Sequence, residues 1–315
     1  MNDGDAAPAR SRRTLALTLA SVVLAWVWLL FGHLGDFGQS LAIVGPALYT
    51  GVVVLHAIAA AVRRRAIVLV AAVAWIASGA VMVLSPRTPV SYAAPRAPIT
   101  LVAANLRFDN PTPEAAARAV IDRHADIVVV SEATDRSAAV LTGAYRYHAR
   151  SDGGNDGYSE LVVSRYPLHL RSGYRQMLAV DVRAPAPFEL LAAHFPRAGY
   201  GLHAFRGHFN FGAQAQSVRV VDRLRADATL PVVLAGDLNV SDRTSTYRHL
   251  VARRRDAMRA GWAGPTFRLF PFSLLSLRID HVIVDRDWCA AHARRFHPGG
   301  SDHESVQVTI GPCPA

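Results

Sequence analysis

The chain contains no lysine and only two cysteines in 315 residues. Two cysteines exclude a disulfide-rich scaffold and a zinc site built from cysteines alone. Charged residues are also scarce, at 18%, whereas hydrophobic residues reach 51%. This balance excludes a disordered chain and is more apolar than that of an ordinary soluble enzyme. The formal net charge of +10 comes from arginine and suits anionic partners such as phosphate esters, acidic lipid or nucleic acid.

Much of the apolar excess lies near the N-terminus. Residues 14–32 contain no charge and no proline, and similar stretches cover about 41–62 and 66–84. Each stretch has the length of a bilayer-spanning helix. A cleaved signal peptide is the alternative for the first stretch, but two further stretches follow it and no small-residue cleavage site is evident. The sequence therefore predicts three transmembrane helices within residues 14–84.

The positions of arginine predict how these helices are oriented. Arg10, Arg12 and Arg13 precede the first stretch, and residues 63–65 are three further arginines before the third. Positive charge favours the cytoplasmic side, so residues 1–13 are expected to be a cytoplasmic tail. Three spans would then place the rest of the chain outside, with 85–97 as a proline-rich linker and 98–315 as an extracytoplasmic catalytic domain. The expected location is the cell membrane, as a multi-pass protein.

Residues 98–315 show short apolar runs that alternate with stretches of helical composition, which is typical of an α/β domain. Helices are expected at Thr112–His124, Ala213–Arg225 and Thr244–Arg255. Strands are expected at Ile99–Asn105, Asp126–Glu132, Glu160–Ser164, Phe188–His194, Val232–Asp237, Ile279–Val284 and Ser305–Ile310.

Polar side chains of the kind used in catalysis occur at or near the ends of several predicted strands. They lie in the segments VAANLRF, VVVSEAT, AAHFPRAG, VLAGDLNVS, RIDHVIV and GGSDHESV. Taken singly, each has an ordinary structural explanation, such as a turn, a helix cap or a loop. Their order along the chain, between Ile99 and Ile310, resembles that of the endonuclease/exonuclease/phosphatase superfamily of metal-dependent phosphoesterases. The resemblance implies a DNase I-like four-layer sandwich, in which two packed β-sheets are flanked by helices.

The resemblance also implies a role for each motif residue. A hard cation, Mg²⁺ or alternatively Mn²⁺, is held by oxygen ligands and assists attack on phosphorus. The expected metal ligands are Asn105, Glu132 and Asp302. The expected catalytic residues are His194, Asp237, Asn239, Asp280 and His303, with Asp280 polarising His303. His281 follows Asp280 on a strand, so it points to the opposite face and is expected to be structural.

Three further features leave alternatives open. Residues 199–212 and 267–277 are rich in apolar side chains and form either an apolar lip beside the cleft or ordinary core and loop segments. Cys289 and Cys313 form either a disulfide or two buried thiols, with the bridge slightly favoured. Trp262 and Thr266 are expected to be structural.

The preferred function is hydrolysis of a lipid-linked phosphate or diphosphate at the outer membrane surface, with the bilayer as a partner. An extracytoplasmic nuclease acting on nucleic acid is the alternative, since a basic domain can contact phosphates. A catalytically inactive binding domain is the third possibility, and the full set of acids and histidines argues against it.

Overall fold

A computed structural model describes residues 66–314, apart from 85, 153–158, 175, 199–210 and 269–275. It also describes residues 16, 19–24, 26–27, 39–40, 43, 51–56 and 58. The chain divides into two compact units. One contains residues 1–86 with 243–245, and the other contains residues 87–242 with 246–315.

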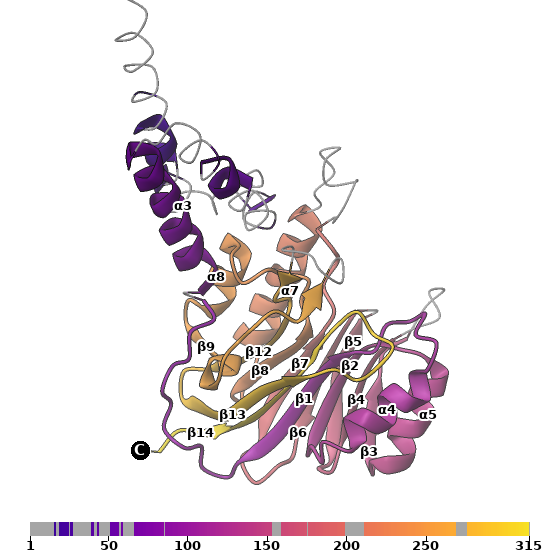
Figure 1. Ribbon diagram of the computed structural model, residues 1–315. Helices are drawn as coiled ribbons and strands as arrows, with labels where there is room; N and C mark the ends of the chain where they lie inside the picture. The colour runs from indigo at the N-terminus through magenta and orange to yellow at the C-terminus, as the bar shows by residue number, and fades with distance from the viewer. Residues whose placement is uncertain are drawn as a thin grey trace, which may run out of the picture. The chain divides into compact units, whose positions relative to one another are not determined.

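The first unit includes helix α3 (Ala66–Leu84; Figure 1). This helix is buried along one face and exposed along the other. Val68, Ala71, Ala72 and Trp75 have the spacing of one helical face and are all buried. The Trp75 indole Nε1 donates a hydrogen bond to Ser21 Oγ at 2.7 Å, which ties α3 to a second helical segment. The opposite face carries exposed residues, among them Leu69, Val73 and Ile76.

The prediction of three transmembrane helices within 14–84 is contradicted. Among the residues that the structure describes, no helix is long and apolar enough to cross a membrane. Hydropathy counts the apolar residues in a stretch, whereas in the structure Val68, Ala71, Ala72 and Trp75 of α3 are buried by other residues. The predicted multi-pass membrane location, with an extracytoplasmic catalytic domain, depended on these spans and is corrected with them. Residues 1–13 and most of the first two apolar stretches lie outside the described residues.

The second unit contains two six-stranded sheets (Figure 1). The first sheet has the strand order β13-β14-β1-β2-β4-β3. Its strands β1 and β2 are parallel, whereas the other neighbours are antiparallel. In this sheet the bounds are β1 (Ile99–Asn105), β2 (Ile127–Ala133), β3 (Tyr147–Arg150), β4 (Ser159–Ser164), β13 (Trp288–Phe296) and β14 (Ser305–Pro312).

The second sheet has the order β5-β6-β7-β8-β12-β9. Strands β7 and β8 are parallel, and all other neighbours are antiparallel. In this sheet the bounds are β5 (Leu168–Tyr174), β6 (Met177–Val182), β7 (Phe188–Ala193), β8 (Val232–Asp237), β9 (Arg254–Asp256) and β12 (Asp280–Asp285). A short two-stranded pair, β10 (Phe267–Arg268) with β11 (Ser276–Leu277), precedes β12.

Alternate residues of the central strands face different layers. Leu101 and Val129 of the first sheet pack with Leu190 and Val282 of the second in a core between the sheets. Helices cover both outer faces: α4 (Pro113–Ile121) and α5 (Asp135–Ala144) lie on the first sheet, and α7 (Phe211–Ala226) and α8 (Ser245–Val251) lie on the second. The described residues thus form the four-layer α/β sandwich that the sequence predicted.

One predicted helix needs correction. The helix expected over Thr244–Arg255 ends at Val251, because Arg254–Asp256 form β9 at the edge of the second sheet. Residues 87–97 of the segment expected to be a linker belong to the second unit. The Val90 amide donates a hydrogen bond to the Arg259 carbonyl at 2.7 Å, and the Tyr92 hydroxyl donates to the Asp256 carbonyl at 3.0 Å.

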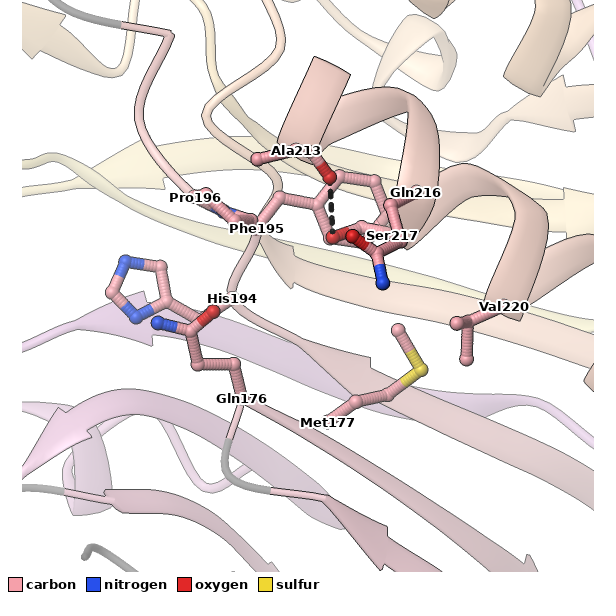
Figure 2. A pocket seen from close by; sticks show the side chains of 9 residues that line it. All are labelled: Gln176, Met177, His194, Phe195, Pro196, Ala213, Gln216, Ser217 and Val220. Carbon is pink, nitrogen blue, oxygen red and sulfur yellow. Dashed lines mark hydrogen bonds between the residues drawn. The ribbon is translucent and has the colours of Figure 1, made fainter. Parts of the chain in front are cut away.

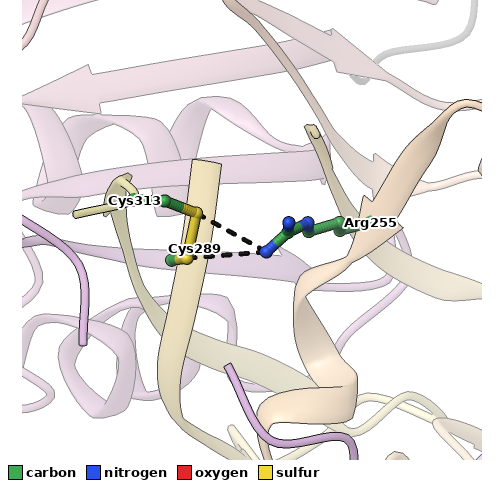
Figure 3. The surroundings of a disulfide bond; sticks show 3 residues. All are labelled: Arg255, Cys289 and Cys313. Carbon is green, nitrogen blue, oxygen red and sulfur yellow. Dashed lines mark hydrogen bonds between the residues drawn. A yellow bond between two sulfur atoms is a disulfide. The ribbon is translucent and has the colours of Figure 1, made fainter. Parts of the chain in front are cut away.

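Cys289 and Cys313 form a disulfide, so the bridge was the correct alternative. It joins the start of β13 to the residue that follows β14, and Arg255 of β9 lies beside both sulfur atoms (Figure 3). The site residues His303 and Asn105 lie beside the other end of β14, which pairs with β1 in the antiparallel sense. The disulfide and the candidate site are therefore at opposite ends of the first sheet.

Candidate active site

The predicted site residues come from both sheets and meet at the ends of the central strands. In the first sheet, Asn105 ends β1 and is paired with Ser131, which places Glu132 next to it. In the second sheet, Asp237 at the end of β8 is the direct cross-strand partner of Asp280 at the start of β12. His194 follows β7, which runs parallel to β8. Local strand assignments cannot predict this meeting, since it depends on how the two sheets pack.

Asn105 links the carboxylates of the two sheets. Its Nδ2 donates hydrogen bonds to Glu132 Oε1 at 3.1 Å and to Asp237 Oδ2 at 3.0 Å. Its Oδ1 accepts from the Arg107 amide at 2.8 Å, and this contact defines which end of the amide group is oxygen. In this arrangement Asn105 orients the two carboxylates through its NH₂ group.

Glu132 is held in a backbone conformation that is uncommon for a residue with a side chain. Its φ is +58°, in the left-handed region, and the pairing of β2 with β4 is irregular between Val130 and Ala133. A non-glycine residue in this region costs about 1 kcal/mol or more. The irregularity directs the carboxylate to the end of the sheet, where Oε2 accepts from the Phe108 amide at 2.9 Å.

Gly236 allows β7 and β8 to approach closely before Asp237. Its φ is +134°, and a Cβ atom at this position would lie 2.2 Å from the Ala193 carbonyl oxygen. The residue before Asp237 must therefore lack a side chain. The Asp237 carboxylate is buried, and its Oδ1 accepts from the Asn239 amide at 2.9 Å.

His303 and Asp280 form a buried ion pair that connects the two sheets. His303 Nδ1 lies 2.9 Å from Asp280 Oδ2, and its Nε2 lies 3.7 Å from Asp237 Oδ2. Burial disfavours the charged imidazole, but Asp280 and Asp237 outweigh it and raise the pKa of His303 to about 9. Burial raises the pKa of Asp280, although His303 opposes this effect. The polarisation of His303 by Asp280 that the sequence predicted has the required geometry.

His194 lies among three carboxylates. Its Nε2 is 3.7 Å from both Glu132 Oε1 and Asp237 Oδ2, and its Nδ1 is 3.5 Å from Glu160 Oε1. Burial lowers its tendency to protonate, but Glu160, Asp237 and Glu132 raise the pKa of His194 to about 9. Asp237 is also buried, which favours its neutral form, but His303 and His194 hold the pKa of its carboxyl below the usual value.

Two contributors to the site were not predicted as such. Glu160 on β4 was assigned to a strand alone, but its buried carboxylate faces His194 and accepts from Ser131 Oγ at 2.9 Å. Ser301 donates from Oγ to the Asn105 carbonyl at 2.8 Å and accepts from the His303 amide at 3.1 Å. Ser301 therefore joins β1 to the start of β14. The motif GGSDHESV contains this serine, but only its position relative to β1 reveals the contact.

The two remaining predicted residues, Asn239 and Asp302, lie within two residues of Asp237 and His303 in the sequence. The Asn239 side chain donates to the Phe195 carbonyl at 2.9 Å, which joins the ends of β7 and β8. Asp302 is exposed, whereas its neighbours Ser301 and His303 are buried. Its charge adds to the raised pKa of His303, after the larger effects of burial, Asp280 and Asp237.

The structural role predicted for His281 agrees with its surroundings. His281 is fully buried on the opposite face of β12, and its Nε2 donates to the Val240 carbonyl at 2.7 Å. Burial, with the nearby Arg278 charge, lowers the pKa of His281 to about 4, so it is neutral at pH 7. Thr266, also expected to be structural, accepts from the Ile279 and Asp280 amides through Oγ1 at 3.0 and 3.1 Å.

The donor set fits a divalent cation. With every group ionised, four buried carboxylates outnumber two imidazoles and the Arg197 guanidinium, which lies 3.4 Å from Glu132 Oε1. Burial raises the pKa of Glu160 and of Asp280, so protons can offset part of this charge. An excess of buried negative charge is costly unless a cation or proton compensates it. The four carboxylates are Glu132, Glu160, Asp237 and Asp280.

The geometry allows more than one set of ligands. Potential ligand atoms of Asp237, Asp280 and His303 all lie within 4.8 Å of one another. Asp280 and His303 already bond each other, whereas Glu132 and Asp237 are held together through Asn105. The carboxylate oxygens of Glu132 and Asp237 are ligands of the kind that Mg²⁺ prefers.

Comparison with solved structures shows the same fold at low identity. D. rerio TDP2, described as complexed with single strand DNA product, has a TM-score of 0.54 and 15% identity over 69% of this chain and all of that chain. An endonuclease/exonuclease/phosphatase from Beutenbergia cavernae DSM 12333 has a TM-score of 0.53 and 19% identity over 70% of this chain and 73% of its own. Truncated TDP2 from Caenorhabditis elegans has a TM-score of 0.54 and 16% identity over 68% and 97%.

Comparison with curated protein sequences finds no match. The profile of the Endonuclease/Exonuclease/phosphatase family, by contrast, matches residues 102–303, which make up more than half of the chain. The matched residues run from β1 to His303 and so include the whole candidate site. With this match and the shared sandwich, the chain belongs to the endonuclease/exonuclease/phosphatase family, whose members hydrolyse phosphoesters.

Proposed function

We propose that this chain hydrolyses phosphate esters with the help of a bound divalent cation, Mg²⁺ or Mn²⁺. The observation that carries the proposal is the meeting of Asn105, Glu132, His194, Asp237 and His303 in one buried cluster at the strand ends of both sheets. Such a cluster combines carboxylates for a cation with cationic donors for a phosphoryl group.

The role proposed for each residue follows from its charge. Glu132 is the proposed principal ligand, with Asn105 orienting its carboxylate and Asp302 contributing as a further ligand. When bound, the cation neutralises charge on the phosphoryl oxygens and lowers the pKa of a water molecule. His194 and His303, held in the protonated form by nearby carboxylates, donate hydrogen bonds to phosphoryl oxygens from Nε2.

Asp237 is the proposed residue that orients the attacking water and receives its proton. Its carboxylate remains ionised because His303 and His194 offset the effect of burial on its pKa. Asn239, whose amide donates to Asp237 Oδ1, fixes the position of this carboxylate. Asp280 keeps His303 oriented through the 2.9 Å contact at Nδ1.

Two substrate classes follow from different observations. The lipid-linked phosphate predicted from the sequence loses its argument from membrane spans, and residues 269–275 of the apolar segment 267–277 lie outside the described residues. Nucleic acid, the alternative predicted from the sequence, is included because D. rerio TDP2, which shares the fold, is described with a single-stranded DNA product. At 15% identity the shared fold does not carry that substrate over, so both classes belong in the test.

The test uses the purified full chain, first treated with a chelator and then supplied with Mg²⁺ or Mn²⁺. We expect hydrolysis of bis(p-nitrophenyl) phosphate to disappear on chelation and to return with metal. Single-stranded DNA, a polyprenyl diphosphate and phospholipid are assayed side by side to identify the substrate class. A metal-replete chain that releases product from none of these esters would contradict the proposal.

A matched control separates the site from unrelated histidine–aspartate pairs. His249 contacts Asp222 at 2.8 Å on the exposed surface, with the same residue types as the buried His303–Asp280 pair. His249→Ala should leave metal-dependent hydrolysis unchanged. A large loss in this variant would show that the assay reports a global effect.

A further inference from the structure

A network of buried charged side chains adjoins the ends of β8 and β12 that contribute to the candidate site. Arg278, two residues before Asp280, donates from Nε to Asp242 Oδ2 at 3.1 Å. Its Nη2 lies 2.7 Å from Asp256 Oδ2. Arg87 donates from Nε to the same Asp242 oxygen at 2.7 Å. We call Arg87, Asp242, Asp256 and Arg278 the buried ion-pair network, because their side chains are between 0 and 5% exposed.

The buried ion-pair network joins segments that are distant in the sequence. Asp242 follows β8 and Asp256 ends β9, whereas Arg87 precedes β1 and lies 155 residues before Asp242. The Arg87 carbonyl also accepts from the Ala263 amide at 3.2 Å, so both the backbone and the side chain of Arg87 are fixed. The family profile matches from residue 102, so Arg87 lies outside the matched residues.

The network is better suited to fixing positions than to stabilising the fold. Taking a charge out of water costs several kcal/mol per ion, and apolar replacements of buried ion pairs are often equally stable. Burial favours the neutral form of Asp256, but Arg278 outweighs it and holds the pKa of this carboxyl below its usual value. Two guanidinium groups therefore meet two carboxylates. A planar guanidinium between carboxylates accepts only a narrow range of geometries, so these contacts restrict how the joined segments can move.

Backbone hydrogen bonds connect the network to the candidate site. The pairing of β8 with β12 ends at the two carboxylates that these strands contribute to the site. Beyond them, the Leu238 amide donates to the Ile279 carbonyl at 2.9 Å, and the Asp242 amide donates to the Arg278 carbonyl at 3.3 Å. The side-chain ion pair of Asp242 with Arg278 closes the same junction. Loss of this ion pair would allow the two strand ends to separate.

We infer that Arg87, Asp242 and Arg278 are positioning residues, which hold the site carboxylates of β8 and β12 at the separation that turnover requires. This inference rests on the proposed function. It gives the segment before β1 a part in the active domain, because Arg87 comes from that segment. Glu132, the proposed principal ligand of the cation, lies on the other sheet. The network should therefore affect turnover more than it affects binding of the cation or of phosphate.

Asp242→Asn tests the network, because it retains the shape of the side chain and removes the charge that binds both guanidinium groups. We expect kcat for bis(p-nitrophenyl) phosphate at saturating Mg²⁺ to fall by about tenfold or more, since a misplacement of about 1 Å can cost about 10²-fold. KM, and the Kd of Mg²⁺ and of inorganic phosphate measured by titration calorimetry, should change by less than about threefold. Arg87→Met should act in the same direction. Arg87→Lys, which retains the charge, should have a higher kcat than Arg87→Met.

Two matched controls separate positioning from a general loss of stability. Arg96→Met removes an exposed arginine from the same segment as Arg87 and should leave kcat unchanged. Val220→Ala weakens the packing of α7 on the second sheet, where Val220 lines a pocket of about 370 Å³ between α7 and β6 (Figure 2). It should lower Tm and retain kcat at temperatures well below Tm.

The outcomes separate this inference from the proposed function. Unchanged kcat in both Asp242→Asn and Arg87→Met would overturn the inference, while hydrolysis by the original chain still supports the proposed function. Losses of kcat that Val220→Ala reproduces at an equal loss of Tm, or that phosphate binding follows equally, would also overturn it. If Asp242→Asn does not fold, the comparison of Arg87→Met with Arg87→Lys decides. Absence of metal-dependent hydrolysis in the original chain would overturn the proposed function itself.

Discussion

Asp237 is the residue on which the candidate site converges. Its Oδ2 atom lies 3.0 Å from Asn105 Nδ2 and 3.7 Å from Nε2 of both His194 and His303. One carboxylate oxygen thus faces an amide from the first sheet and two imidazoles. The surrounding positive charge keeps it ionised despite complete burial. A substitution that tests this arrangement should therefore remove the negative charge of Asp237 and keep the shape of its side chain.

Asp237→Asn retains the shape and removes the charge. We expect turnover of bis(p-nitrophenyl) phosphate to fall by at least about 10²-fold, the scale for a positioned base or electrostatic group. His303→Gln should cause a loss of similar size, while His281→Gln should retain turnover in the folded protein. Steady-state kinetics with saturating Mg²⁺ would measure these changes. Near-normal turnover in Asp237→Asn would overturn its assigned role.

The raised pKa of His303 predicts how the metal-free chain responds to alkaline pH. Its pKa is about 9 in the folded chain and about 6.5 when unperturbed. The unfolded chain therefore loses this proton first as pH rises, and the associated stability is present below about pH 6.5 and lost progressively up to about pH 9. The shift corresponds to about 3 kcal/mol at most, to order of magnitude.

Thermal unfolding in the presence of a chelator, between pH 6 and 9.5, measures this loss. The Tm should decrease over that range, and His303→Gln should reduce the slope. His249→Ala, which removes an exposed imidazole, should keep the slope of the original chain. An identical pH dependence in His303→Gln would contradict the assignment of a protonated His303.

At the scale of elements, the close approach of β7 and β8 determines whether His194 and Asp237 can meet. The approach is possible because Gly236 has a positive φ and its Cα lies against the Ala193 carbonyl. Asn239 then secures the same two strand ends by donating to the Phe195 carbonyl. In the segment GDLN, the backbone conformation therefore requires glycine at position 236, in addition to the side chains of Asp237 and Asn239.

Gly236→Ala should disrupt this junction. The added Cβ would lie 2.2 Å from a backbone oxygen, so β7 and β8 must separate or the backbone must change conformation. We expect a loss of at least about 2–3 kcal/mol in unfolding free energy, together with reduced turnover. Chemical denaturation and kinetics would measure both effects.

Gly143→Ala is the matched control, because it adds the same methyl group where nothing lies within 4 Å. Gly143 lies in α5, where alanine is the better helix former, so stability should rise by up to about 1 kcal/mol. Equal effects of the two substitutions would show that the approach of β7 to β8 is not a constraint.

At the scale of the whole molecule, the disulfide and the site occupy opposite ends of the first sheet. Cys289 is the second residue of β13 and pairs with Gly311, and Cys313 follows the last residue of β14. The intervening segment includes Ser301 and His303, which contribute to the site. The disulfide closes this segment into a loop and restricts the unfolded chain.

Replacing both cysteines with alanine should lower the unfolding free energy by about 3 kcal/mol. For a domain of this size, we expect Tm to fall by roughly 5–10 °C, with turnover retained at temperatures well below Tm. Calorimetry with and without a reductant would measure the change. Reductant should lower the Tm of the original chain and leave the double variant unaffected; the opposite pattern would contradict a stabilising bridge.

The sequence by itself determined the alternation of strands and helices and most of the motif residues. A short run of apolar residues predicts a buried strand, because both faces of such a strand are covered by other layers of the fold. Strands β1 and β8 have the predicted bounds. The same reasoning missed β3, β5, β9 and β13, where polar or basic residues interrupt the pattern on strands at the sheet edges. It also missed β6, although the sequence MLAVDV is almost wholly apolar. It also wrongly predicted transmembrane helices in the N-terminal region, because an apolar stretch does not specify what its side chains pack against.

Only the tertiary structure decided how the motif residues meet. Glu160 and Ser301 join the site through contacts at 29 and 196 residues of sequence separation, which no local pattern contains. The left-handed conformation of Glu132 and the pairing of Asp237 with Asp280 depend on strand register, which packing of the two sheets sets. Sequence periodicity records which face of an element is buried, whereas the site is formed by the relative positions of elements. For that reason the residue types were predictable and their contacts were not.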